Sequence, residues 1–151
     1  MVYSQQFESK QWIISPDASF NGYTVASQPG FFYRVEGGIA VEYCLSSKFM
    51  AGMRGGFSGF RNELRKGNDV QGGVFARYYI INGLNVYTGV LLQSQQRNEI
   101  IGGIGYGVKV NPGFVIEPGI EYVHFFEQKE NDNYLMGRIA FRFVWPCLKN
   151  E

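Results

Sequence analysis

The feature that most constrains this chain is a two-residue alternation that leaves one face of each extended segment without charge. In residues 33–45, YRVEGGIAVEYCL, the odd positions are uncharged, whereas the even positions carry Arg34, Glu36 and Glu42 among small residues. Successive side chains of a β-strand point to opposite faces, so this period predicts a strand with one apolar and one charged face. The apolar face must therefore meet either a protein core or lipid.

The same alternation recurs along the chain and predicts eight strands. They cover residues 11–21, 33–45, 49–59, 70–79, 84–93, 99–110, 114–125 and 135–145. A tilted strand of about 9–11 residues is long enough to cross a bilayer. Membrane-spanning strands are thus compatible with the pattern, although the chain has no apolar run of the length that a membrane helix needs.

The charged face carries arginines, a lysine and carboxylates in balanced numbers, interleaved with glycines. Its charged residues are Asp17, Arg34, Glu36, Glu42, Arg54, Arg77, Glu99, Lys109, Glu117, Glu121, Arg138 and Arg142. Glycine weakens a strand and needs a spatial reason, which the narrow lumen of an eight-stranded barrel supplies. Arginine and carboxylate side chains can pair there, so we interpret the charged face as the interior and the apolar face as lipid-facing. A soluble barrel or sandwich with reversed faces is the alternative.

Aromatic residues on the apolar face gather near the strand ends. One set is Trp12, Tyr43, Phe49, Tyr78, Phe114, Phe143 and Trp145, and the other set is Phe20, Tyr33, Phe57 and Tyr122. Two such belts, separated by Val, Ile, Ala and Gly, are typical of the two membrane interfaces.

The connections alternate between short and long. Residues 46–48, 81–83 and 111–113 have tight-turn composition, whereas residues 22–30, 61–69, 94–98 and 127–133 are longer and polar. Short periplasmic turns and longer outer loops are typical of bacterial outer-membrane barrels. The pattern predicts an all-β, closed, antiparallel eight-stranded transmembrane barrel with a polar, filled lumen. It would span residues 11–145, between periplasmic tails 1–10 and 146–151.

Composition narrows the function classes. The net charge of +1 offers no electrostatic basis for nucleic-acid binding. The first ten residues, MVYSQQFESK, lack the basic start and apolar segment of a signal peptide. We therefore expect a mature form with an added start methionine, located in the outer membrane of a Gram-negative cell.

Several stretches resemble a known family. VEGGIAVEYCLSSKFMAGMRGGF, VFARYYIINGLNVYTGV and FVIEPGIEYVHF are similar to small outer-membrane barrels of the OmpA/OmpX type, in particular to the barrel domains abundant in Bacteroidetes. The final strand, GRIAFRFVW, resembles the terminal signal of such proteins, but six residues follow it here. The resemblance implies a closed barrel with a filled lumen. The family includes adhesins and host-interaction proteins.

Candidate chemistry is sparse. His124 is the one histidine, at the loop rim in phase with the lipid face, and the residues two positions away are Tyr122 and Phe126 rather than the serine of lipid A deacylases. Ser58 and Ser94 lie at the loop end of other strands. The sequence has no Cys/His cluster for a metal. The glycines of GGIGYG do not indicate a dinucleotide-binding motif, because no helix is predicted to follow them.

Two further features leave alternatives open. Cys44 and Cys147 both map to the periplasmic end, where a disulfide is permitted but needs the C-terminal tail to bend inward. In the segment 61–69, Arg61, Arg65 and Lys66 are candidate contacts for lipopolysaccharide phosphate or for another protein, or simply solvated loop residues.

We expect a non-enzymatic cell-envelope protein without a cofactor that contacts outer-membrane lipid and lipopolysaccharide. Its role would be structural, in surface interaction, or as an accessory subunit with other outer-membrane proteins. The alternatives are a lipid A-modifying enzyme at the outer rim, a narrow channel, and a soluble lipocalin-like barrel.

Overall fold

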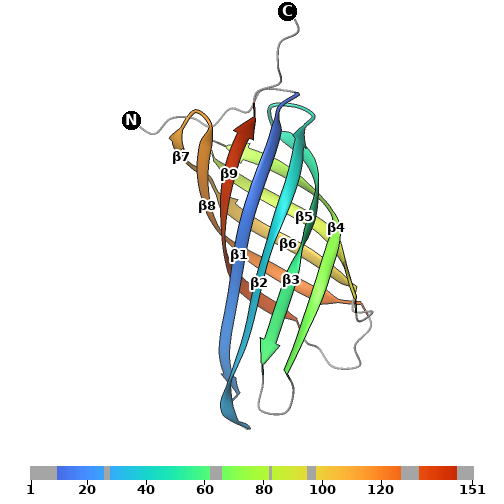
Figure 1. Cartoon of the computed structure of the whole chain (residues 1–151). Coiled ribbons are helices and arrows are strands. Elements are labelled where there is room, and N and C mark those ends of the chain that lie inside the picture. Colours follow the sequence, from blue (N-terminus) through green and yellow to red (C-terminus); the bar gives the residue numbers. More distant parts are fainter. Residues whose placement is uncertain are drawn as a thin grey trace, which may run out of the picture.

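The computed structural model describes residues 10–25, 28–61, 66–81, 83–94, 98–126 and 133–145, which form a single closed β-barrel (Figure 1). Its strands are β1 (Trp12–Val25), β2 (Gln28–Cys44), β3 (Phe49–Arg61), β4 (Lys66–Ile81), β5 (Leu84–Gln93), β6 (Glu99–Tyr106), β7 (Val108–Asn111), β8 (Phe114–Phe125) and β9 (Tyr134–Trp145). Within this described part of the chain, no helix is long and apolar enough to cross a membrane.

The sheet closes because each strand pairs antiparallel with its neighbours around the ring. The order is β6-β5-β4-β3-β2-β1-β9-β8-β7, and the additional pairing of β6 with β8 completes the barrel. Strands β6 and β7 pair with the two ends of β8, so the elements form eight barrel strands. The predicted closed eight-stranded barrel is confirmed.

One predicted strand is divided in two. Residues 99–110 were expected to be continuous, but β6 ends at Tyr106 and β7 begins at Val108. The β5 ladder stops at the pair Leu84–Tyr106, and the amide of Gly107 donates to the carbonyl of Gly83 at 2.9 Å. Beyond this contact the chain pairs with β8 alone, which explains the break.

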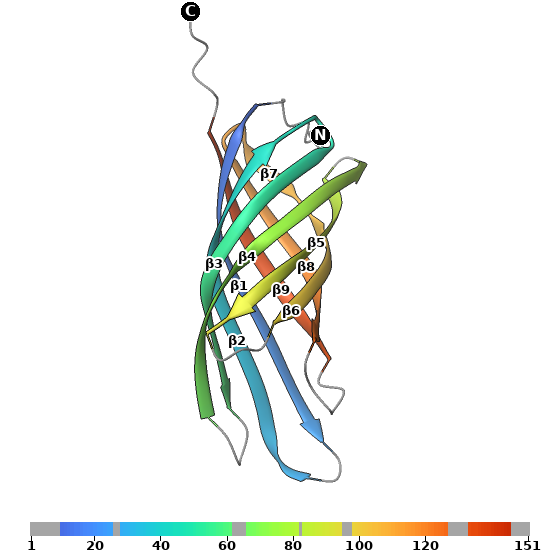
Figure 2. The ribbon, with the colours of Figure 1, turned by 90° about the vertical axis from the view of Figure 1, so that its right-hand side faces the viewer.

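Two expected loops are largely strand. Residues 22–30 and 61–69 were predicted to be loops, but β1 continues to Val25, β2 begins at Gln28, β3 continues to Arg61 and β4 begins at Lys66. Cross-strand pairing extends these strands: residues 22–25 pair with β2, and residues 66–69 pair with β3 although Lys, Gly, Asn and Asp are residue types that strands disfavour. The β1–β2 and β3–β4 hairpins project past the ends of β5 and β6 (Figures 1 and 2).

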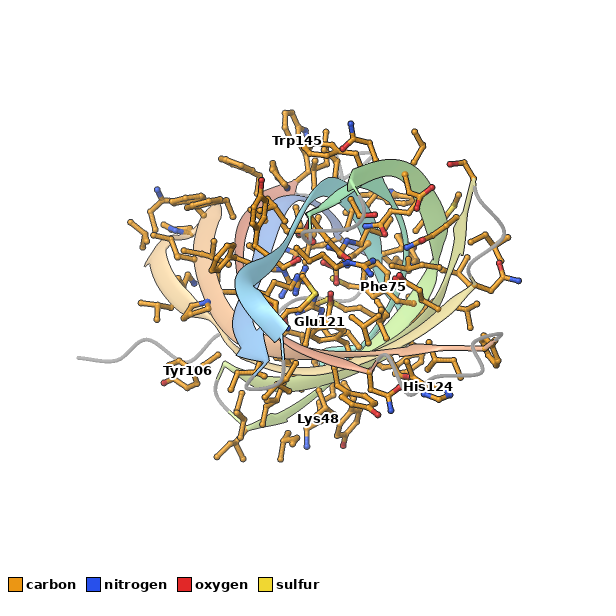
Figure 3. All side chains as sticks on the ribbon, turned by 90° about the horizontal axis from the view of Figure 1, so that it is seen from below. Lys48, Phe75, Tyr106, Glu121, His124 and Trp145 are labelled. Carbon is orange, nitrogen blue, oxygen red and sulfur yellow. The ribbon has the colours of Figure 1, made fainter. Side chains whose placement is uncertain are left out.

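Burial follows the predicted alternation, with the apolar residues outside. Leu91 is fully buried, whereas its neighbour Leu92 is 58% exposed, and Met53 is 69% exposed. Viewed along the barrel, Glu121 and Phe75 point inward, whereas Trp145, Tyr106 and His124 lie outside the wall (Figure 3). The charged face is therefore the interior, which rules out the reversed arrangement of a soluble barrel with an apolar ligand cavity.

Candidate functional site: the charged lumen

The lumen brings together eleven of the twelve charged residues predicted for it. They are Asp17, Arg34, Glu36, Glu42, Arg54, Arg77, Glu99, Glu117, Glu121, Arg138 and Arg142, and each is buried. Each also takes part in at least one ion pair with another member of the set. The pairs fall into three tiers, which we name inner (at the turn end), middle and outer (at the loop end).

The inner tier joins two arginines to two glutamates. Glu42 accepts from Arg77 and from Arg142, each at 3.0 Å. Glu117 accepts from Arg77, from Arg142 at 3.0 Å, and from the amide of Asn85 at 3.0 Å. Two arginines face two glutamates, so the tier is neutral, and each of the four charges has two partners of the opposite sign within it.

The middle tier repeats this balance around Asp17 and Glu121. Arg54 lies 3.2 Å from Asp17 and 3.3 Å from Glu121, and Arg138 lies 2.7 Å from Asp17. The hydroxyl of Tyr87 donates to Glu121 at 2.9 Å. Two arginines again face two carboxylates. A contact of 3.5 Å between Arg138 and Glu117 links this tier to the inner one.

The outer tier has a different composition. Arg34 pairs with Glu36 and with Glu99, each at 2.6 Å. Two amide side chains complete the group: Gln71 donates to Glu36 at 3.4 Å, and Gln93 donates to Glu99. One arginine therefore serves two glutamates here.

Apolar side chains fill the lumen beside these tiers. Ile13, Cys44, Met50 and Tyr79 form a buried cluster, and they lie near the turn end of their strands. A second cluster comprises Tyr87, Leu91, Ile101, Val123 and Met136. Paired charges and packed apolar groups together occupy the interior, as expected for a filled lumen.

Glycine makes room for the side chains that cross the lumen. Gly103 lies opposite Tyr87 in the β5–β6 register, and a Cβ at Gly103 would collide with the Tyr87 ring. The ring therefore lies across the backbone of Gly103 and reaches Glu121. Two guanidinium groups also lie within cation–π distance of the ring, with Arg77 at 5.1 Å and Arg138 at 5.0 Å from its centroid.

Lys109, the remaining predicted lumen charge, does not join the network. It lies in the short strand β7 at the turn-end rim and is partly exposed. No ion pair to Lys109 is formed among the described side chains. The prediction was wrong because β7 lies beyond the end of the β5 ladder, away from the arginines and carboxylates of the network.

The predicted charge network leaves out several polar members of the lumen. Asp69 was assigned to a loop, but it is buried in β4 and accepts from Ser94 at 3.2 Å. The side chains of Gln71, Asn85, Tyr87 and Gln93 are also buried and bonded to the charged residues. Their signal was present in the sequence, since each shares the strand phase of the charged positions.

The predicted aromatic belts lie on the outer face. At the turn end, the rings of Trp12 and Tyr43 are 4.8 Å apart and those of Phe114 and Phe143 are 5.0 Å apart, while Trp12 also pairs with Trp145 across β1 and β9. The other predicted belt residues, Phe20, Tyr33, Phe49, Phe57, Tyr78 and Tyr122, are exposed or partly exposed. Tyr106 and Phe141 are further exposed aromatics that the prediction omitted.

His124 does not lie near a serine nucleophile. It is exposed on β8, where its Nδ1 lies 2.7 Å from Asn133 Oδ1 and its ring packs edge-on against Phe126. Ser58 is buried inside the barrel on β3, which is four strands from β8 in either direction around the ring. Ser94 bonds to Asp69 at the end of β5. The described residues thus assemble no hydrolase triad around this histidine.

Some predicted contacts lie outside the described part of the structure. They involve Arg65, Cys147, the tails 1–9 and 146–151, and the side chains of Arg61 and Lys66, none of which the structure describes. Cys44 is buried in the cluster with Ile13, Met50 and Tyr79, and the disulfide alternative with Cys147 falls outside the described residues. Within the described chain, His, Cys, Asp and Glu side chains form no group of three that could hold a metal ion.

No family model matches the sequence, and no curated protein sequence matches it. The fold is similar to the N-terminal β-barrel domain of OprF from Pseudomonas aeruginosa, with a TM-score of 0.63 and 13% identity over 91% of this chain and 98% of that one. A de novo designed transmembrane β-barrel gives 0.56 and 12%, covering 93% of this chain and all (100%) of that one. The outer-membrane protein OprG from the same bacterium gives 0.54 and 9%, over 95% and 99%. At these identities, the similarity concerns the fold.

Proposed function

We propose that this chain is a non-enzymatic protein of the bacterial outer membrane whose sealed barrel serves as a rigid anchor for interactions at its loop end. The observation that carries the proposal is the filled lumen. Its paired arginines and carboxylates are buried, and apolar clusters pack beside them. Such a lumen supports a structural role in preference to a channel.

The outer-membrane location is supported by the surface of the barrel. An apolar wall bordered by aromatic residues suits lipid, and short turns at one end with longer hairpins at the other match the outer-membrane pattern. The similar solved structures include two named as Pseudomonas aeruginosa outer-membrane proteins. In this proposal the turns face the periplasm, and the wall contacts membrane lipid and lipopolysaccharide. The resemblance to Bacteroidetes barrels stays a prediction.

An accessory or surface-interaction role is supported by the projecting hairpins. Pairing of β4 with β5 begins at Gln71–Gln93, and pairing of β1 with β9 ends at Phe20–Gly137. Lys66–Asn68 and Asn21–Val25 therefore extend past these ladders, with strand edges that could add a strand from a partner. In sequence, Arg61, Arg65 and Lys66 lie at the connection between β3 and β4, and they are candidate contacts for a phosphate group or an acidic partner.

Two measurements test the proposal. Planar-bilayer recording of the purified barrel should show no steady conductance, and a stable single-channel current would overturn the sealed lumen. Native gel electrophoresis of gently solubilised membranes should place the wild-type protein in a complex larger than the barrel. Migration as a monomer under these conditions would overturn the accessory role.

A hairpin variant locates the interaction. Replacing residues 24–31 with an Asn-Gly turn should release the barrel from the complex while leaving it folded, because the cut joins the paired residues Tyr23 and Phe32. The control is Ser47→Ala, at the opposite end of the barrel, which should leave the complex intact. Replacement of His124 by Ala should leave lipid A unchanged in mass, since changed lipid A would favour the enzymatic alternative.

A further inference from the structure

The outer wall of the barrel carries an apolar groove across strands β3, β4 and β5. Its floor is formed by Ala51, Ala76 and Thr88, which pair with one another in a single cross-strand row. The groove has a volume of about 610 Å³, and its lining is almost entirely apolar. The hydroxyl of Thr88 already donates to the carbonyl of Ile101 at 3.1 Å. The groove therefore suits a hydrocarbon occupant.

Larger side chains border the groove on both sides. The adjacent outward-facing rows hold exposed residues, namely Met53, Val74 and Val90 toward the loops and Phe49, Tyr78 and Val86 toward the turns. Rows on the same face of a sheet are two residues apart along each strand, which is about 6.7 Å. A groove one row wide admits a hydrocarbon chain, whose carbons contact others at about 4 Å, but not an α-helix with a diameter of about 10–12 Å. The width favours a single acyl chain over a membrane helix of a partner protein.

The groove runs from the turn-end rim toward the middle of the wall. Its row starts at Trp12, the first residue of β1, and passes through Tyr43, the last residue but one of β2. The row reaches Thr88 at the fifth of the ten residues of β5. With strands about 4.8 Å apart, the distance from Tyr43 to Thr88 is about 14 Å. An acyl chain that follows this path has its headgroup at the turn-end aromatic belt and its tail toward the bilayer centre.

Positive charge lies beside the turn-end mouth of the groove. Lys10 immediately precedes the start of β1, Lys48 lies in the turn between β2 and β3, and both are exposed. Lys48 lies outside the barrel wall (Figure 3). Every carboxylate whose side chain the structure describes is buried. The described part of the rim therefore presents positive charge, which attracts a phosphate group.

We propose that the groove binds one acyl chain of an anionic phospholipid, whose phosphate lies at the rim beside Lys10 and Lys48. Since the surrounding lipid is as apolar as the groove, the preference comes from close packing and from the charge of the headgroup. The rings of Trp12 and Tyr43 suit the level between chain and headgroup. The inference rests on the proposed outer-membrane location, and in that orientation the lipid belongs to the periplasmic leaflet.

The test is native mass spectrometry of the whole purified chain, released from nonionic detergent micelles that contain dioleoyl phosphatidylglycerol. The wild-type barrel should retain one phosphatidylglycerol molecule in preference to dioleoyl phosphatidylcholine at equal concentration. Gel mobility of boiled and unboiled samples, taken after folding into vesicles, tests insertion separately. A chain that does not insert would overturn the membrane location, whereas an inserted barrel that retains no lipid would overturn this inference alone.

Variants assign the two parts of the site. Ala76→Leu fills the floor and should abolish lipid retention, and Ala51→Leu provides a second floor variant. The matched control is Ala18→Leu, because Ala18 is an exposed alanine of β1 outside the groove and its replacement should leave retention unchanged. Lys48→Ala should lower the preference for phosphatidylglycerol about fivefold. Lys109→Ala, on β7 across the ring, should leave it unchanged.

Three results would overturn the proposal. Equal lipid retention in the wild type and in both floor variants would place the lipid elsewhere on the wall. Equal retention of phosphatidylcholine, or an unchanged preference in Lys48→Ala, would remove the anionic headgroup from the site. Loss of the larger native complex in Ala76→Leu, with lipid retention unchanged, would show that a protein partner occupies the groove.

Discussion

Replacing Glu117 with glutamine should strongly destabilise the barrel. Glu117 is 1% exposed and accepts from Arg77, from Arg142 at 3.0 Å and from Asn85 at 3.0 Å. Glu117→Gln keeps the shape but leaves the inner tier with one uncompensated positive charge. Removal of one partner from a buried ion pair costs about 3–5 kcal/mol. We expect a loss of that size in the free energy of unfolding.

A second substitution should recover part of this loss. In the double variant Glu117→Gln/Arg77→Met, Glu42 and Arg142 remain paired at 3.0 Å and the inner tier is neutral again. The two substitutions should therefore be non-additive, with a coupling free energy of about 2–3 kcal/mol. As a control, Glu117→Gln and Arg34→Met affect different tiers and should add to within about 0.5 kcal/mol.

The assay is reversible urea unfolding in lipid vesicles. Fluorescence of Trp12 and Trp145 reports the transition, since both are exposed on the outer face of the barrel. Native-gel mobility of unboiled samples provides a second probe. A loss below about 1 kcal/mol for Glu117→Gln, or a double variant as unstable as the sum of the single variants, would refute the reasoning from charge balance.

The remaining predictions concern space, lipid and turns. Gly103→Ala should destabilise the barrel by about 2 kcal/mol or more because it displaces the Tyr87 ring, whereas Gly102→Ala on the outer face should cost little; urea unfolding compares them. Val74→Lys should cost about 2–4 kcal/mol at mid-wall, against about 0–1 for Val70→Lys nearer the rim, measured by folding into vesicles. Gly83→Ala should slow or weaken folding because Gly83 has φ of +86°, a conformation that strains alanine; refolding kinetics test this.

The barrel and the orientation of its faces could be predicted because both depend on strand periodicity. A shift of one residue in the alternation would exchange the positions of Leu91 and Leu92 between lumen and lipid. The flanking residues of the strand indicate which of the two faces is apolar. The same rule predicted which charged residues enter the lumen. It failed for Lys109, whose phase is inward but whose strand has passed beyond the β5 ladder.

Features that depend on contacts between distant segments could not be predicted. The break between β6 and β7 depends on the hydrogen bond from Gly107 to Gly83, and the strand extensions depend on pairing beyond the rim. The tiers depend on the stagger of the strands, since Arg54 of β3 meets Glu121 on the opposite strand β8. Asp69 was assigned to a loop because its local composition is polar, although its phase matches that of Gln71.

The claim most central to this account is that the apolar face meets lipid and the charged face fills the lumen. Nuclear Overhauser contacts between detergent acyl chains and side-chain methyl groups test it directly, without any substitution. We predict contacts to Val74, Val90 and Leu92, and none to the buried Leu91, Ile101 and Val123. Contacts to the second group, or their absence from the first, would contradict the account.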